Sequence, residues 1–471
     1  MKINKTFLWA LAQRTGPAFI SFVFFLILAR LMGPAQFGLL ALALVWLGGF
    51  RVIGNAGFSG AVIQARNLSD RQLSSVFFLN LGTSLLLMLI SSASVWIFPM
   101  EEGIGDLPQV VSFMSLTLMV SGFTLIQEAL AYRGMRFRFL AQRDLISAIT
   151  GGVVGVVLAL RGWGVWALVM QTLVTSIVSA ILLWRGAQWL PKWSEFSIAE
   201  VKPLLKFSLW LLAFQLFAYL VKEIDKTMIG FMVGISALGI YTLANKVILI
   251  PTVIFSDALN SYLFPKLSSL QGNAEDMRPV YMGSVSLTMS IALPLIFALG
   301  MGIYLYGARA LGPQWDGVDQ VAPYVAVIAA CQSYISPAGS ILKALGQVSL
   351  LFKWAVFVFS LMVIGALGGA GFGIEGIMAG LVGANLICTM AVNLLMRQVI
   401  GLKSMLRQVA HFYVILGFGL GLAAVTINAL VSLGVQSVAI SSAVTLAAAL
   451  FYFFTVALSL RNRIGHYLKF N

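Results

Sequence analysis

Long apolar segments alternate with short polar connections along the whole chain. A helix needs about 20 predominantly apolar residues to cross the hydrocarbon region of a bilayer. By this criterion the pattern predicts fourteen membrane-spanning helices, at 6–31, 37–62, 74–98, 107–132, 142–160, 165–184, 204–233, 237–264, 280–306, 318–345, 349–367, 374–396, 409–431 and 436–460. We therefore expect an all-α integral membrane protein without a separate soluble domain.

The composition supports this interpretation and argues against a soluble enzyme. Of the 471 residues, 60% are hydrophobic and 10% are charged, whereas a soluble domain carries about 25% charged residues. Cys331 and Cys388 lie in separate apolar runs, and His411 and His466 are far from them and from each other. Such isolated residues form neither a disulfide framework nor a zinc motif. No metal or other cofactor is expected.

The distribution of Lys and Arg predicts the orientation in the membrane. Cytoplasmic loops of membrane proteins carry an excess of positive charge. With the N-terminus placed inside, only Arg30, Arg161 and Arg309 fall in outer loops, and the predicted inner loops and tails hold most of the 30 cationic residues. Both termini are then cytoplasmic. The net charge of +14 is spread over these loops, so it does not indicate nucleic-acid binding.

Two predicted outer turns recur weakly in the second part of the chain. The sequence Gly-Pro-Ala-Gln-Phe-Gly at 33–38 is matched by Gly-Ile-Ser-Ala-Leu-Gly at 234–239, and Gly-Trp-Gly-Val-Trp-Ala at 162–167 by Gly-Phe-Gly-Ile-Glu-Gly at 371–376. Both offsets are about 200 residues, which indicates a parallel repeat of six helices. We predict an N-lobe at 1–190, a C-lobe at 191–400 and two additional helices at 401–471.

Charged side chains inside the predicted spans are the candidate functional residues. An ionisable group at bilayer depth costs several kcal/mol and usually faces a cavity or a partner. The candidate cations are Arg14, Arg51, Lys222, Lys226 and Lys246. At about 1.5 Å of rise per helical residue, Arg14 and Arg51 fall in the inner half of the membrane. The three lysines fall in the outer half.

The two lysines of the seventh span share one helix face, because they are four residues apart. Their positive charges repel each other unless an anion lies between them. That anion is either Asp225 or an anionic ligand. A structural ion pair with Asp225 is the plainer explanation. Arg51 has no acid nearby in the sequence, whereas Arg14 is close enough to the interface to extend its side chain there. For Glu128 and Asp257, near the inner ends of their spans, we expect an interfacial position or pairing with loop arginines.

Several segments resemble the Wzx-type polysaccharide transporters, a branch of the multidrug/oligosaccharidyl-lipid/polysaccharide exporter superfamily. The resemblance runs over nearly the whole chain. It is carried by LARLMGPAQFGL at 28–39, AGFSGAVIQ at 56–64, LSSVFFLN at 73–80, RGMRF at 133–137, DKTMIG at 225–230, LGIYTLANK at 238–246 and FPKLS at 264–268.

The resemblance implies a fold of two six-helix lobes around a central cavity, with two extra helices. It also implies a flippase that moves an undecaprenyl-diphosphate-linked oligosaccharide across the bacterial inner membrane by alternating access. Related lipid flippases hold the diphosphate with cations in spans one, two and eight, where this chain has Arg14, Arg51 and Lys246. Asp225 is the candidate for coupling to a proton or sodium gradient.

Two rival functions remain open at this stage. A drug/cation antiporter of the same superfamily would need acids and aromatic rings in its cavity, whereas cations outnumber well-placed acids here. A polymerase or membrane glycosyltransferase usually carries a large loop with carboxylates, which this sequence lacks. The expected partners are the lipid-linked oligosaccharide, membrane lipids, a polysaccharide polymerase and a chain-length regulator, and we expect a monomer.

Overall fold

The computed structural model describes residues 5–54, 69–97, 105–270, 274–397, 401–432 and 438–467, in some helices by the backbone alone at several positions. These residues form helices and their connections, without a β-strand in the ranges described. The predicted all-α class is therefore confirmed.

The chain divides into two compact units, Met1–Gly239 and Ile240–Asn471. The helices of the first are α1 (Lys5–Leu31), α2 (Pro34–Gly54), α4 (Asp70–Ser94), α5 (Leu107–Met114), α6 (Leu116–Arg133), α7 (Phe137–Leu160), α8 (Val165–Arg185) and α9 (Ile198–Met232). α10 (Ile235–Ser269) begins in the first unit and continues into the second. The second also contains α11 (Ala274–Leu311), α12 (Val318–Ala344), α13 (Val348–Gly369), α14 (Gly373–Leu395), α16 (Leu402–Ser432) and α17 (Val438–Tyr467).

Most helices are long and apolar enough to cross a bilayer, which makes the chain a multi-pass membrane protein. Ten such segments lie within the described residues. The count of fourteen spans, the lobe boundaries at 190 and 400, and the cytoplasmic termini stay predictions. Several helices extend beyond the predicted apolar runs, as in α11 and α16, because a helix can continue through polar turns at the membrane surface.

The predicted span 107–132 consists of two helices, α5 and α6, separated at Ser115. The Ser115 hydroxyl donates to the Ser112 carbonyl at 2.7 Å, and the Thr117 hydroxyl donates to the Met114 carbonyl at 2.7 Å. Such bonds from Ser and Thr to backbone carbonyls often bend helices. The break places Thr117 at the start of α6, where it meets α2.

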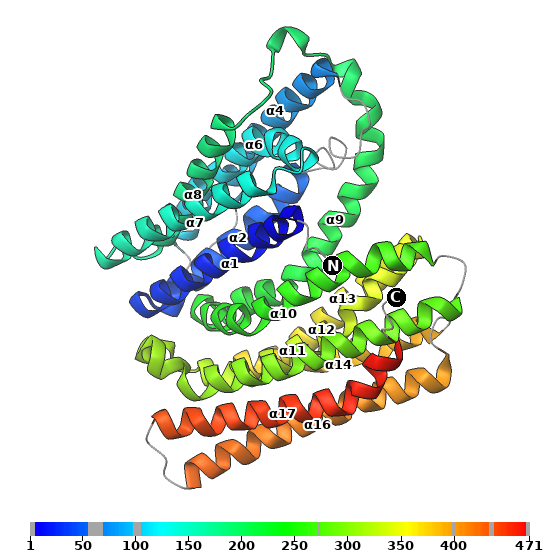
Figure 1. Cartoon of the computed structure of the whole chain (residues 1–471). Helices are drawn as coiled ribbons and strands as arrows, with labels where there is room; N and C mark the ends of the chain where they lie inside the picture. Colours follow the sequence, from blue (N-terminus) through cyan, green and yellow to red (C-terminus); the bar gives the residue numbers. More distant parts are fainter. Residues whose placement is uncertain are drawn as a thin grey trace. The chain divides into compact units, whose positions relative to one another are not determined.

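The first unit is built around two sets of helices (Figure 1). α7 packs against α1 and α8, while α4 packs against α6. α9, the predicted seventh span, contacts α2 and α4 within this unit. The contact between α2 and α9 matters for function, because candidate cations lie on both helices.

In the second unit, α13 and α14 approach each other at backbone distance. Gly365 lies against the Gly380 backbone, and Gly369 lies against the Gly376 backbone. A Cβ atom at any of these four positions would overlap the facing main chain. Small residues at such crossings are the usual device for close packing of membrane helices.

Replacing Gly380 with Ala is expected to destabilise the protein, because the methyl group would force α13 and α14 apart. Overpacking costs about 1–3 kcal/mol. Gly383→Ala, on the same helix, is the matched control, since a Cβ there meets nothing within 4 Å and should be neutral or slightly stabilising. Thermal unfolding of the two purified variants measures the difference, and equal stabilities would contradict the observed crossing.

The second pair of repeated turns shares one glycine with the same backbone conformation. Gly164, before α8, has φ 54° and ψ −136°, and Gly373, at the start of α14, has φ 67° and ψ −151°. Only glycine adopts this combination readily. The two turns therefore match at this glycine, which supports the predicted repeat, but they differ at Gly162, whose φ is 79° while its counterpart Gly371 lies in a short 3-10 helix.

The first pair of repeated turns is in direct contact. A Cβ on Gly38 would overlap the carbonyl of Ile235, and a Cβ on Gly239 would overlap the carbonyl of Pro34. All four residues lie in the first unit. The contact is reciprocal, because Pro34 and Ile235 occupy one repeat position and Gly38 and Gly239 occupy another.

Candidate functional site

Arg51 lies one turn from the C-terminal end of α2, with an exposed side chain. Its guanidinium donates to the Thr117 hydroxyl of α6 at 3.4 Å. The described contacts of the guanidinium include no ion pair with a carboxylate. Arg51 therefore presents a positive charge within a helix that is otherwise apolar, as the sequence predicted.

Tyr219 joins α9 to α2 beside Arg51. Its hydroxyl donates to the Val45 carbonyl at 2.7 Å, and its ring occupies the space left by Gly48, where a Cβ would overlap it. Arg51 is one turn beyond Gly48 and lies within electrostatic range of the Tyr219 hydroxyl. Sequence reasoning missed Tyr219, because nothing in the sequence pairs it with Gly48.

The predicted charged group on α9 lies within two turns of Tyr219. Lys222 is exposed, and Lys226 forms a close ion pair with Glu223. An Asp225 carboxylate oxygen accepts from the backbone N–H of Lys226 at 2.8 Å. The acid that pairs with Lys226 is thus Glu223. Its spacing of three residues is the signal that could have identified it.

The remaining two predicted cations are Lys246 and Arg14. Lys246 is half-buried on α10, in the second unit. The Arg14 side chain and the Asp257 side chain lie outside the described residues. The structure brings Arg51, Lys222 and Lys226 onto the two packed helices α2 and α9. Convergence of all five cations on one cavity stays a prediction.

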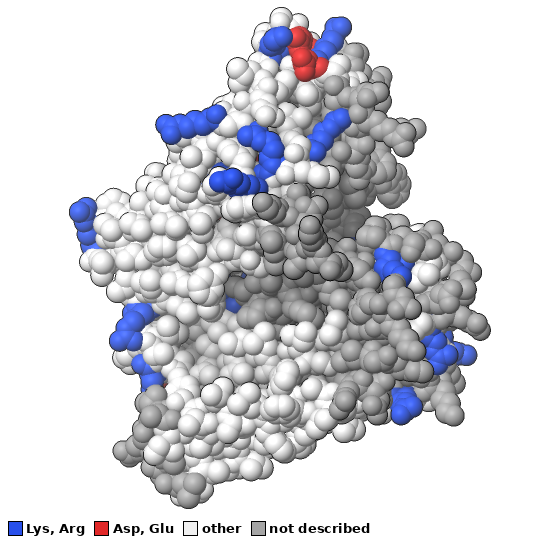
Figure 2. Space-filling view, viewed as in Figure 1, with Lys and Arg blue, Asp and Glu red and all other residues white. Residues whose placement is uncertain are grey.

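An open cleft of about 570 Å³ lies elsewhere, among α12, α13 and α14 of the second unit. It contains none of the predicted site residues. Its lining includes Tyr324, Gly365, Gly369, Phe372, Glu375 and Gly380. The face shown in Figure 2 carries Lys and Arg in separate groups, without one continuous basic patch.

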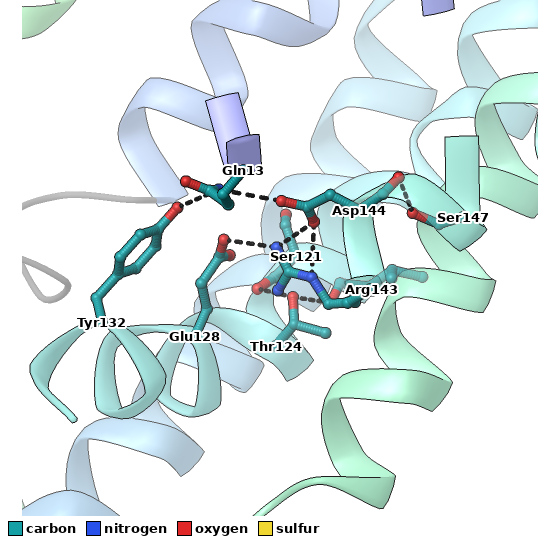
Figure 3. Close-up of polar contacts among 9 residues, drawn as sticks. Gln13, Ser121, Thr124, Glu128, Tyr132, Arg143, Asp144 and Ser147 are labelled. Carbon is teal, nitrogen blue, oxygen red and sulfur yellow. Dashed lines mark hydrogen bonds and ion pairs between the residues drawn. The ribbon is translucent and has the colours of Figure 1, made fainter. Parts of the chain in front are cut away.

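A network of buried charges joins three helices of the first unit (Figure 3). Arg143 of α7 is 6% exposed and binds Glu128 of α6 at 3.0 Å and Asp144 at 2.6 Å. The Gln13 amide of α1 donates to Asp144 at 3.0 Å and to the Tyr132 hydroxyl at 3.1 Å. One guanidinium and two carboxylates therefore tie α1, α6 and α7 together.

This network confirms one expectation and corrects another. Glu128 pairs with an arginine, as expected. The charge count, however, grouped Arg143 with the cations of the inner loops, although the predicted span begins at 142, and Arg143 is a buried residue inside α7. α7 begins at Phe137, so Arg143 belongs to a helix and not to a loop. The side of the membrane on which it lies stays a prediction. The neighbouring Asp144 was the available signal, since a buried arginine requires a counter-charge.

Relatives from several bacteria resemble this chain over most of its length. The succinoglycan biosynthesis transport protein ExoT of Rhizobium meliloti (strain 1021) is 27% identical over 74% of this chain and 70% of the relative. The lipopolysaccharide biosynthesis protein WzxC of Escherichia coli (strain K12) is 26% identical over 76% of this chain and 72% of the relative.

Solved transporter structures share the fold at low sequence identity. The lipid II flippase MurJ, in an inward closed conformation, matches with a TM-score of 0.72 and 12% identity, covering 97% of this chain and all of that one. An inward-facing multidrug transporter of the MOP superfamily matches with a TM-score of 0.60 and 14% identity, over 83% and 97% of the two chains. The transporter fold implied by the resemblance is therefore confirmed, whereas its division into two six-helix lobes and two extra helices stays a prediction.

The model of one protein family matches residues 27–320, described as polysaccharide biosynthesis protein. This range covers more than half of the chain, and it includes α2, α9 and the whole of α10. The resemblance noted in the sequence is confirmed, and the chain belongs to the polysaccharide biosynthesis protein family.

Proposed function

We propose that this protein is a flippase that moves an undecaprenyl-diphosphate-linked oligosaccharide across the bacterial inner membrane by alternating access. The names of its relatives support transport of such a substrate: they include a succinoglycan transport protein, a teichuronic acid biosynthesis protein and a probable glycan biosynthesis flippase. The observation that carries the proposal is the exposed Arg51 within α2, which packs against α9, the helix that carries Lys222 and Lys226.

The chemistry of the substrate explains why these cations are needed. A diphosphate cannot enter hydrocarbon without replacement of its hydration, for the same reason that a charged side chain is costly there. Charge-assisted hydrogen bonds from Arg and Lys supply that replacement. In this proposal Arg14 and Arg51 capture the diphosphate from the cytoplasmic side. Lys246, with Lys222 or Lys226, holds it in the outward-facing form.

The proposal extends to topology, coupling and partners. Residues 1–190 and 191–400 form the two lobes, and both termini are cytoplasmic. Asp225 couples transport to a proton or sodium gradient, and the hydrogen bond that it accepts from the Lys226 backbone N–H supports this role. The protein acts as a monomer together with a polysaccharide polymerase and a chain-length regulator, and it catalyses no covalent step.

Complementation tests the proposal directly. The gene is expressed in a strain that lacks its own flippase for a lipid-linked glycan, with surface polymer and the inner-leaflet intermediate as readouts. We expect polymer to return and the intermediate to fall. Continued accumulation of the intermediate in a strain with normal levels of the membrane-inserted protein would reject it. Resistance to cationic drugs without polymer export would instead support the antiporter.

A further inference from the structure

The face of α9 that packs against α2 carries several polar side chains. Tyr219, Glu223 and Lys226 follow each other at helical spacing, so they lie on one side of the helix. The Tyr219 hydroxyl bonds to the Val45 carbonyl, and Gly230, one turn after Lys226, lies near Leu42. Contacts on both sides of the ion pair therefore direct this face of α9 toward α2.

Both side chains of the Glu223–Lys226 ion pair are largely buried but keep some exposed surface. The Glu223 side chain is 11% exposed and the Lys226 side chain 25% exposed. Neither charge alone is tolerated easily at bilayer depth, and the pair is close to neutral. The lysine is the more accessible partner, so an incoming anion meets the ammonium group before it meets the carboxylate.

A diphosphate can replace Glu223 at this position, whereas a monophosphate gains little. Exchange of a carboxylate for a singly esterified phosphate leaves Lys226 with one anionic partner, as before. A diphosphate brings further negative charge, which the exposed Lys222, one turn away on the same helix, can bind. These side chains thus favour a ligand with two adjacent phosphoryl groups.

We propose that Glu223 is an exchangeable counter-ion that neutralises Lys226 in the empty transporter and yields it to the diphosphate of the substrate. The inference rests on the proposed flippase function and adds a specificity-determining residue to it. Glu223 competes with every anion for Lys226. A lipid diphosphate binds Lys226 strongly enough to displace Glu223, whereas a lipid monophosphate does not. When Glu223 binds Lys226 again, it assists release of the substrate.

Binding of farnesyl diphosphate and farnesyl monophosphate to the purified full-length protein in nanodiscs tests this role. Glu223→Gln keeps the shape of the side chain and removes its charge. We expect both ligands to bind about tenfold more tightly or better, with the larger gain for the monophosphate. The ratio of the affinities for diphosphate and monophosphate should therefore fall. In the complemented strain, surface polymer should appear more slowly, because the variant releases the lipid diphosphate more slowly.

The chain provides a matched control in Lys192 and Glu195. They form a second Lys–Glu pair with the same three-residue spacing, at 3.3 Å, but outside the proposed site. Glu195→Gln should leave both affinities unchanged. Should Glu223→Gln fold poorly, Glu223→Gln combined with Lys226→Gln restores neutrality, and that protein should lose most of its affinity for diphosphate.

The outcomes separate this inference from the proposed function. If the wild-type protein binds farnesyl diphosphate and Glu223→Gln leaves the affinities unchanged or weakens them, Glu223 is a structural partner and the inference is wrong. If the neutral double variant binds diphosphate like the wild type, Lys226 is not a ligand and the inference also fails. If the wild-type protein binds no lipid diphosphate, both this inference and the proposed function fail.

Discussion

Replacement of Arg51 with Ala is expected to stop polymer export while the protein remains folded and inserted. The exposed guanidinium makes one described hydrogen bond, to Thr117 at 3.4 Å, so its loss should cost little stability. In the substrate complex, in contrast, the substitution removes a charge-assisted hydrogen bond to the diphosphate, which is worth about 1.5–3 kcal/mol. That corresponds to about 10- to 100-fold in transport, measured as surface polymer in the complemented strain.

Two further variants make the Arg51 result specific. Arg51→Lys keeps the charge but not the forked geometry, and we expect partial export. Arg161→Ala removes an arginine that is also exposed, at the turn before α8, and it should leave export unchanged. Normal export by Arg51→Ala at wild-type protein levels would remove Arg51 from the site.

Replacement of Arg143 with Ala is expected to destabilise the first unit strongly. The substitution removes the buried arginine that Glu128 and Asp144 share. Because these carboxylates are 38% and 20% exposed, we expect the loss of the charge-assisted hydrogen bonds to cost about 1.5–3 kcal/mol. The amount of inserted protein and its melting temperature in detergent should both fall. The expected defect is one of folding, in contrast to the defect expected for Arg51→Ala.

Arg138 is the control on the same helix. Its guanidinium is exposed and lies over the Trp9 ring at 5.6 Å, a contact worth about 0.5–1 kcal/mol at an exposed site. Arg138→Ala should therefore have a small effect. Combining Arg143→Met with Glu128→Gln and Asp144→Asn should recover much of the lost stability. If the triple variant is less stable than Arg143→Ala, the uncompensated charge is not the cause.

Hydropathy predicted the helical class because a lipid-facing helix must be apolar along a length fixed by the bilayer. It could not locate the helix ends, since helices such as α11 extend past the apolar run. It also missed the break at Ser115, which depends on hydroxyl contacts with particular carbonyls. The Gly164 turn and its Gly373 counterpart were predictable because their backbone requires glycine.

The candidate site was predictable in part. Arg51 could be identified because it interrupts an apolar span without an acid nearby. The charge count grouped Arg143 with the loop cations, because hydropathy alone does not reveal that a charged residue near the start of an apolar run is buried inside the helix. Asp225 was the predicted partner of a lysine, although the three-residue spacing could have identified Glu223 as the partner of Lys226. The meeting of Tyr219 with Gly48, in contrast, depends on the packing of α2 and α9.

The reciprocal contact at Gly38 and Gly239 has a consequence for the origin of the repeat. In a twofold-symmetric dimer, residue i of one subunit contacts residue j of the other, and j contacts i in return. Pro34 with Gly239 and Gly38 with Ile235 follow this rule, with each half of the repeat in the place of a subunit. A six-helix protein that carried only one of these turns would present a self-complementary surface. Gene duplication would then have joined in one chain a contact that two identical chains can form.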